Sequence, residues 1–84
     1  MKPIYRVLSL QTRLKPEVII FKADQFLGKR SEQLEEKERN PGWISFEGSG
    51  GCVFISIVAA GRTQTVDAET GEFGYQVRRF LEML

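Results

Sequence analysis

Residues 43–60, WISFEGSGGCVFISIVAA, contain two runs of strand-forming residues around a glycine-rich turn. Aromatic and β-branched residues predominate in Trp43–Glu47 and Cys52–Ala60, and Gly48–Gly51 supplies the small residues of a hairpin connection. Cys52–Ala60 is apolar at both odd and even positions, a pattern typical of a central strand that is covered on both faces. The stretch therefore predicts an antiparallel hairpin at the centre of a sheet.

Two further strands are expected outside this hairpin. Ile4–Thr12 carries apolar residues on both parities, and Lys15-Pro16 marks its boundary with the next element, because a residue before proline avoids helical dihedral angles. Arg62–Val66 is polar and rich in threonine, which suits the edge of a sheet. Together with the hairpin, these runs predict an antiparallel sheet of about four strands.

The segment from Pro16 to Gly28 is compatible with two structures. Pro16 suits the first turn of a helix, whereas the β-branched run within Glu17–Lys22 also allows a short strand followed by a helix. The helix is favoured, because four apolar residues recur at the spacing of one helical face. These residues are Ile19, Ala23, Phe26 and Leu27.

Ser31–Arg39 is also predicted to be helical, with Ser31 as its N-cap and Glu35 and Arg39 at the stabilising i,i+4 spacing. Leu34 is its only apolar residue. Proline cannot continue a helix, and asparagine or glycine accepts left-handed dihedral angles, so Asn40-Pro41-Gly42 is expected to end it.

Leu34 lies seven residues after Leu27 and fourteen after Ile20. If Gly28 does not interrupt the helix, the three apolar residues form a heptad-like stripe. A coiled-coil seam and an amphipathic helix packed on its own sheet both explain such a stripe, and the second interpretation is favoured.

A final helix is expected to reach Leu84, with Asp67 as its cap and a regular part that begins near Tyr75. Five apolar residues share its buried face: Phe73, Val77, Phe80, Leu81 and Leu84. Residues 1–84 are thus expected to form one small α+β domain with the order β-α-β-β-β-α, in which the helical regions cover one face of the sheet.

Composition excludes several classes of function. The 84 residues include one cysteine and no histidine, so the chain offers no internal disulfide, no zinc site built from several thiolates and no histidine-based catalysis. No apolar run approaches the length of about 20 residues that a membrane-spanning helix requires. Met1–Leu14 alternates polar and apolar residues, unlike a secretory signal. We expect a cytoplasmic protein with no membrane partner, no cofactor, no metal and no catalytic residue.

Three features that resemble functional elements are interpreted as structural. Gly48–Gly51 lacks the lysine and threonine of a phosphate-binding loop and leads into a strand, so a plain hairpin turn is expected. Cys52 has no histidine to activate it and is expected to be a largely buried, unreactive side chain. Four carboxylates of the predicted second helix are expected to form a solvated face: Glu32, Glu35, Glu36 and Glu38.

The remaining signals favour a non-catalytic interaction module that binds a protein partner, such as a regulator, an inhibitor or an accessory subunit. A homo-oligomer is expected, because Cys52–Ala60 is apolar on both parities and so short a chain covers only one face. Trp43 is the first candidate for an interface anchor, since tryptophan is enriched at binding hot spots. The stripe of Ile20, Leu27 and Leu34 supplies the other interface candidates.

The alternative is a nucleic-acid-binding module that uses the basic N-terminal third. Residues 1–30 contain seven basic and two acidic side chains, whereas the net charge of the whole chain is only +1 and provides no global attraction to phosphate. Arg6, Arg13, Lys15 and Arg62 are the candidate phosphate contacts of this alternative. An enzyme that uses carboxylates alone is a distant third hypothesis.

Overall fold

The hairpin predicted over residues 43–60 lies inside a larger antiparallel sheet in the computed structural model, which describes residues 6–29 and 34–84. Strand β3 (Trp43–Gly48) pairs with β4 (Gly51–Ala60), and Gly48 lies opposite Gly51 at the turn. Gly51 has a φ of 152°, and a Cβ at this position would collide with the carboxylate of Glu72. The turn therefore requires glycine at this position.

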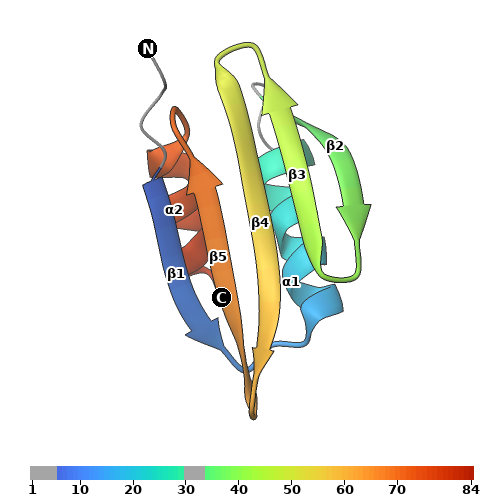
Figure 1. Ribbon diagram of the computed structural model, residues 1–84. Helices are drawn as coiled ribbons and strands as arrows, with labels where there is room; N and C mark the ends of the chain where they lie inside the picture. The colour runs from blue at the N-terminus through green and yellow to red at the C-terminus, as the bar shows by residue number, and fades with distance from the viewer. Residues whose placement is uncertain (1–5, 30–33) are drawn as a thin grey trace.

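Three further strands complete the sheet within the described residues (Figure 1). β1 (Arg6–Thr12) and β2 (Leu34–Asn40) form the two edges, and β5 (Thr63–Thr70) lies between β1 and β4. The strand order is β1-β5-β4-β3-β2, with every neighbouring pair antiparallel. The predicted α+β class is confirmed, and the described part of the chain has five strands where about four were expected. Ile4 and Tyr5 of the predicted first strand lie outside the described residues.

The helices form a second layer on one face of the sheet (Figure 1). α1 (Pro16–Ala23) continues as the π-helical segment η1 (Asp24–Lys29), which confirms the helix predicted from Pro16. α2 (Gly74–Glu82) begins one residue before the predicted regular part. No helix in the described ranges has both the length and the apolar character needed to cross a membrane.

The apolar faces predicted for the two helices are confirmed by their burial. Ile19, Ala23 and Leu27 from the first helix meet Val77 and Phe80 from the last, and all of them have no exposed surface. Because both helices bury these faces against the same side of the sheet, a single core lies between the two layers.

The second predicted helix is wrong, because residues 34–40 form β2. A helix over Ser31–Arg39 would have offered only Leu34 for burial, whereas the strand extends the sheet and still buries Leu34 to 2% exposure. The Oδ1 atom of Asn40 accepts hydrogen bonds from the backbone N–H groups of Gly42 (2.7 Å) and Trp43 (3.0 Å), so Asn40-Pro41-Gly42 is a hairpin turn. Pairing with β3 thus overrides helix propensity here. The proposed cap, Ser31, lies outside the described residues.

Two expectations about β5 are also wrong. Arg62–Val66 was expected at an edge, but β5 is an inner strand because β1 pairs with it from Arg6 opposite Thr70 to Thr12 opposite Gln64. Asp67 does not cap α2: it lies within β5 and accepts a hydrogen bond from the Ser9 hydroxyl at 2.5 Å. This pairing joins segments far apart in sequence, and local composition carries no signal for it.

Within the described residues, the central strand β4 is covered on one face only, as expected for so short a chain. Val53, Ile55 and Ile57 are buried against the helices, whereas Cys52 is exposed and Val58 is 56% exposed on the other side. Both helices lie behind the sheet in Figure 1, and no described residue covers its front. The apolar composition of β4 therefore leaves partly apolar surface open to solvent.

Thr70 connects the end of β5 to the start of α2. Its buried hydroxyl donates to the Cys52 carbonyl (3.0 Å) and accepts from the Phe73 backbone N–H (3.0 Å). We expect Thr70→Val to lower the free energy of unfolding by about 1–3 kcal/mol, because both buried groups lose this partner. Thr70→Ser keeps the hydroxyl and is the matched control. Urea denaturation measures the difference, and an unchanged midpoint for the valine variant would contradict this role.

Candidate functional site

Two aromatic side chains lie together on the face of the sheet opposite the helices, which we call the open face. Trp43 on β3 and Phe54 on β4 are both half-buried, with ring centroids 5.2 Å apart and an interplanar angle of 68°. This is the edge-to-face geometry that aromatic pairs prefer. Their sequence neighbours Ile44 and Ile55 point to the core, because side chains alternate between the faces of a strand.

A shallow groove of about 330 Å³ runs beside this aromatic pair. Its lining comes from β2, β3 and β4. On the open face the groove is bordered by Trp43, Phe54, Ser45, Cys52, Glu47 and Lys37. The site thus combines an apolar centre with a polar and charged rim, as protein-binding surfaces do.

Carboxylates surround the aromatic pair. The pairing register places five of them on the open face: Glu35, Glu38, Glu47, Asp67 and Glu69. Within the described side chains, Lys37 is the cation that accompanies them, and it forms an ion pair with Glu47 at 3.0 Å. Hydrogen bonding to this carboxylate raises the pKa of Lys37. The open face is therefore acidic around an aromatic centre.

Lys37 reaches the open face because β2 has a bulge between Glu36 and Glu38. Glu35 lies directly opposite Glu47, and two like charges at such a cross-strand position repel each other. The ammonium group of Lys37 offsets this repulsion. The bulge thus decides the charge distribution at this border of the groove.

A separate ionic cluster lies on the helix-covered side of β2. The Arg39 guanidinium binds the carboxylate of Glu36 through two nitrogens and approaches Asp24 of η1 at 3.5 Å. Lys29 approaches the same Asp24 carboxylate at 3.9 Å. The hydrogen bond from Arg39 lowers the pKa of Glu36 below its ordinary value. This cluster replaces the predicted helical pair of Glu35 with Arg39 and joins the edge strand to the helical layer.

The lowered pKa of Glu36 leads to a prediction about stability and pH. A carboxylate whose folded-state pKa is depressed stabilises the protein above its ordinary pKa of 4.5, and this contribution is lost as the pH falls through the folded value. Glu36→Gln should therefore lower the free energy of unfolding at neutral pH, by about 0.5–1 kcal/mol for such a surface pair.

Urea denaturation at several pH values tests this prediction, with Glu38→Gln on the opposite face of β2 as the control. The difference between wild type and Glu36→Gln should shrink below pH 4.5. A difference that stays constant down to strongly acidic pH would contradict the ion pair.

The predicted interface residues are dispersed in the structure. Trp43 lies on the open face and is partly exposed there. Ile20, Leu27 and Leu34 are 6%, 0% and 2% exposed and belong to the chain's own core. Leu34 sits on a strand, so the proposed helical stripe does not exist.

Three of the four predicted phosphate contacts are brought to one end of the sheet. Arg13 and Lys15 follow β1, and Arg62 lies in the turn between β4 and β5, which adjoins the end of β1 because Thr12 pairs with Gln64. All three side chains are exposed. The backbone of Arg6 lies at the opposite end of β1, opposite Thr70.

The prediction of a largely buried Cys52 is wrong, because this side chain is exposed on the open face. Phe54 was not among the predicted interface residues, although Ser56 two residues later indicated that this parity of the strand meets solvent. Within residues 6–29 and 34–84, no group of three or more Cys, Asp or Glu side chains is placed to hold a metal ion.

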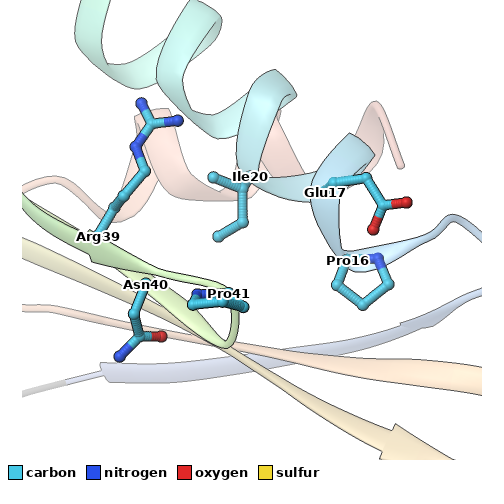
Figure 2. A pocket seen from close by; sticks show the side chains of 6 residues that line it. All are labelled: Pro16, Glu17, Ile20, Arg39, Asn40 and Pro41. Atoms are coloured by element: carbon cyan, nitrogen blue, oxygen red, sulfur yellow. The ribbon is translucent and has the colours of Figure 1, made fainter.

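A second cavity, of about 560 Å³, lies between the first turn of α1 and the β2–β3 turn (Figure 2). Pro16, Ile20 and Pro41 form its apolar walls. Figure 2 shows the Asn40 amide on the far side of the strand from Ile20, and the Arg39 guanidinium is engaged by Asp24 and Glu36. Its polar lining groups therefore do not converge on a ligand, and the open face remains the candidate site.

Comparison of the chain with protein-family models, curated proteins and solved structures finds no match.

Proposed function

We propose that this protein is a non-catalytic interaction module of the cytoplasm, a regulator, inhibitor or accessory subunit that docks a basic protein surface on its open face. The observation that carries the proposal is the half-buried, edge-to-face pair of Trp43 and Phe54 at the centre of an uncovered sheet face. Aromatic side chains anchor interfaces because they bury a large area at low cost in conformational entropy.

The charges around the aromatic pair favour a protein over a nucleic acid. Sheets that bind RNA also expose aromatic residues, but arginine and lysine flank them and neutralise phosphate. Here the flanking positions carry carboxylates, among them Glu38, Glu47 and Glu69, which repel phosphate and attract arginine or lysine. A cationic side chain of the partner can also stack on the indole of Trp43.

The chemistry of the same surface supports a non-catalytic role. The chain has no histidine, so Cys52 lacks the base that most commonly activates a nucleophilic thiol. The carboxylates Glu35, Glu38 and Glu47 are exposed, and solvated carboxylates are poorly suited to proton transfer at neutral pH.

Charge reversal on the open face tests the proposal. The wild-type chain, an Asp67→Lys/Glu69→Lys variant and a Phe21→Ala control are used to capture proteins from native lysate, with and without nuclease. Phe21 is 60% exposed on α1, in the helical layer that covers the opposite side of the sheet. Proteins that resist nuclease, are retained by the control and are lost with charge reversal support the proposal. Retention by all three chains, or loss on nuclease treatment alone, would overturn it.

Nucleic-acid binding is the second candidate, and the grouping of Arg13, Lys15 and Arg62 at one end of the sheet favours it. If a single-stranded oligonucleotide binds there, replacing these three residues by glutamine should weaken binding. It should also flatten the dependence on salt concentration, because each lost phosphate contact removes counterion release. Binding that is tight at physiological salt and abolished by this triple change would favour this candidate over the protein-binding module. No binding at low salt would remove it.

We also propose that the chain forms a homo-oligomer. So small a domain has a limited core of its own and gains buried area by self-association.

A further inference from the structure

The two edges of the sheet differ in how they are protected against pairing with another strand. An exposed edge presents unpaired backbone N–H and C=O groups, and charged residues and bulges are the usual protection. β2 has both devices: a bulge between Glu36 and Glu38, and five consecutive charged residues at 35–39. Its outer edge is therefore blocked to strand addition.

The outer edge of β1 has neither device. Residues 7–12, VLSLQT, carry no charge and no proline, and β1 pairs with β5 in an unbroken register from Arg6 to Thr12. Within the described part of the chain, no strand pairs with its other side. A regular edge of seven residues, of which only Arg6 at its start is charged, is open to a further strand.

We propose that β1 is the dimer interface: two copies of this chain pair antiparallel through β1 about a two-fold axis at Ser9. The two five-stranded sheets then form one continuous sheet of ten strands. This inference rests on the self-association proposed above and names its surface. It does not involve the Trp43 groove, which lies on β3 and β4.

The position of the axis follows from the alternation of side chains. A two-fold axis perpendicular to the sheet keeps the helices of both copies on one face, so each residue must oppose a partner residue of the same face. One residue of the strand must therefore lie directly opposite its own copy, with the axis midway between the two copies. Ser9 is the middle residue of the seven in β1, so an axis at Ser9 pairs the whole strand.

The side chains of β1 suit this pairing. Leu8 and Leu10 lie on the helix-covered side at the edge and are only partly buried. With the axis at Ser9, Leu8 opposes the partner subunit's Leu10, so that both leucines of each copy gain apolar contacts. The strand is therefore complementary to itself, which is the requirement for a two-fold interface.

A lysine at the axis tests the interface without threatening the fold. In Ser9→Lys the new ammonium group faces Asp67 within its own chain, because Ser9 pairs with Asp67. Across the axis it faces the identical lysine of the second copy. Sedimentation equilibrium of the purified chain should give twice the 9.6 kDa monomer mass for wild type and the monomer mass for Ser9→Lys. Circular dichroism checks that the variant is folded.

Glu38→Lys on the β2 edge is the matched control and should remain dimeric. A wild-type mass of 9.6 kDa up to high micromolar concentration, or a dimer that survives Ser9→Lys, would overturn the proposal. Both of these outcomes are measured on the purified chain alone. Failure of the dimer proposal would therefore not change the interpretation of the capture experiment, which tests the open face.

Cross-linking locates the axis independently. In a Cys52→Ser background, Ser9→Cys places two thiols directly opposite each other across the axis, within the range that a disulfide can bridge. Oxidation should give a covalent dimer. Gln11→Cys should not, because Gln11 opposes the partner subunit's Val7 and not its own copy. Equal cross-linking of both variants, or none with Ser9→Cys, would contradict an axis at Ser9.

Discussion

Replacing Phe46 by alanine is expected to lower the free energy of unfolding by about 3–5 kcal/mol. Phe46 lies on the helix-covered face of β3, is 1% exposed and belongs to the core between the two layers. Its ring also approaches Gly28 so closely that a Cβ there would lie 3.2 Å from it, so the end of the first helical region packs directly on this side chain. The cavity left by truncation would therefore open between helix and sheet.

Urea denaturation followed by circular dichroism measures this loss, and Phe21→Ala is the control. The Phe21 side chain is 60% exposed on α1, so its truncation should change stability by only about 0.5 kcal/mol. A loss below about 1 kcal/mol for Phe46→Ala would show that the two layers do not meet at this residue.

The elements that sequence analysis predicted correctly are those whose signal is local. The hairpin over residues 43–60 has its turn residues and both strands in one stretch, and five apolar residues recur at helical spacing in α2 and at its two ends. These elements form as predicted because each one buries the face on which its own apolar residues recur.

The errors share a physical cause, which is pairing between distant segments. β2 has the composition of a solvated helix, and only the available edge of β3 makes it a strand. β5 was expected at an edge because its threonines are polar, but β1 returns to pair with it across more than fifty residues of chain. Tertiary hydrogen bonding decided both cases, and intrinsic propensity did not.

Only part of the candidate site could be predicted from the sequence. Trp43 was proposed as an interface anchor from its residue type, since tryptophan is enriched at binding hot spots. The acidic rim was not, because Glu35 and Glu38 were placed on a helix, far from Glu47. Only the pairing of β2 with β3 brings these carboxylates to one face.

The structure also changes where self-association is expected. The apolar composition of β4 predicted a second copy on its outer side, but that side carries Ser56 and is bordered by Asp67 and Glu69 of β5. Two copies stacked on this face would bring like charges together, which opposes association. The uncharged β1 edge has no such conflict, and its use leaves the open face free for a different partner.

Replacing Trp43 by alanine is expected to weaken binding of the captured partner by about 30-fold or more, a loss of about 2 kcal/mol. The indole packs edge-to-face on Phe54 and remains partly exposed at the groove, so it offers contact area to a partner, and it lies on the face of the sheet opposite the core. Trp43→Phe keeps an aromatic ring and should lose less. Phe21→Ala, on the helical layer, should bind like wild type.

Fluorescence provides a direct readout, because Trp43 is the only tryptophan in the chain. Burial of its indole at an interface should shift the emission of the wild-type chain to shorter wavelength as partner is added, and the titration gives the affinity. The same titration at increasing salt separates the two components of the site. Attraction between the carboxylate rim and a basic partner weakens as salt screens it, whereas the aromatic contact does not. If emission does not change while the partner binds, and Trp43→Ala binds as tightly as wild type, the partner docks elsewhere and the open face is not the binding site.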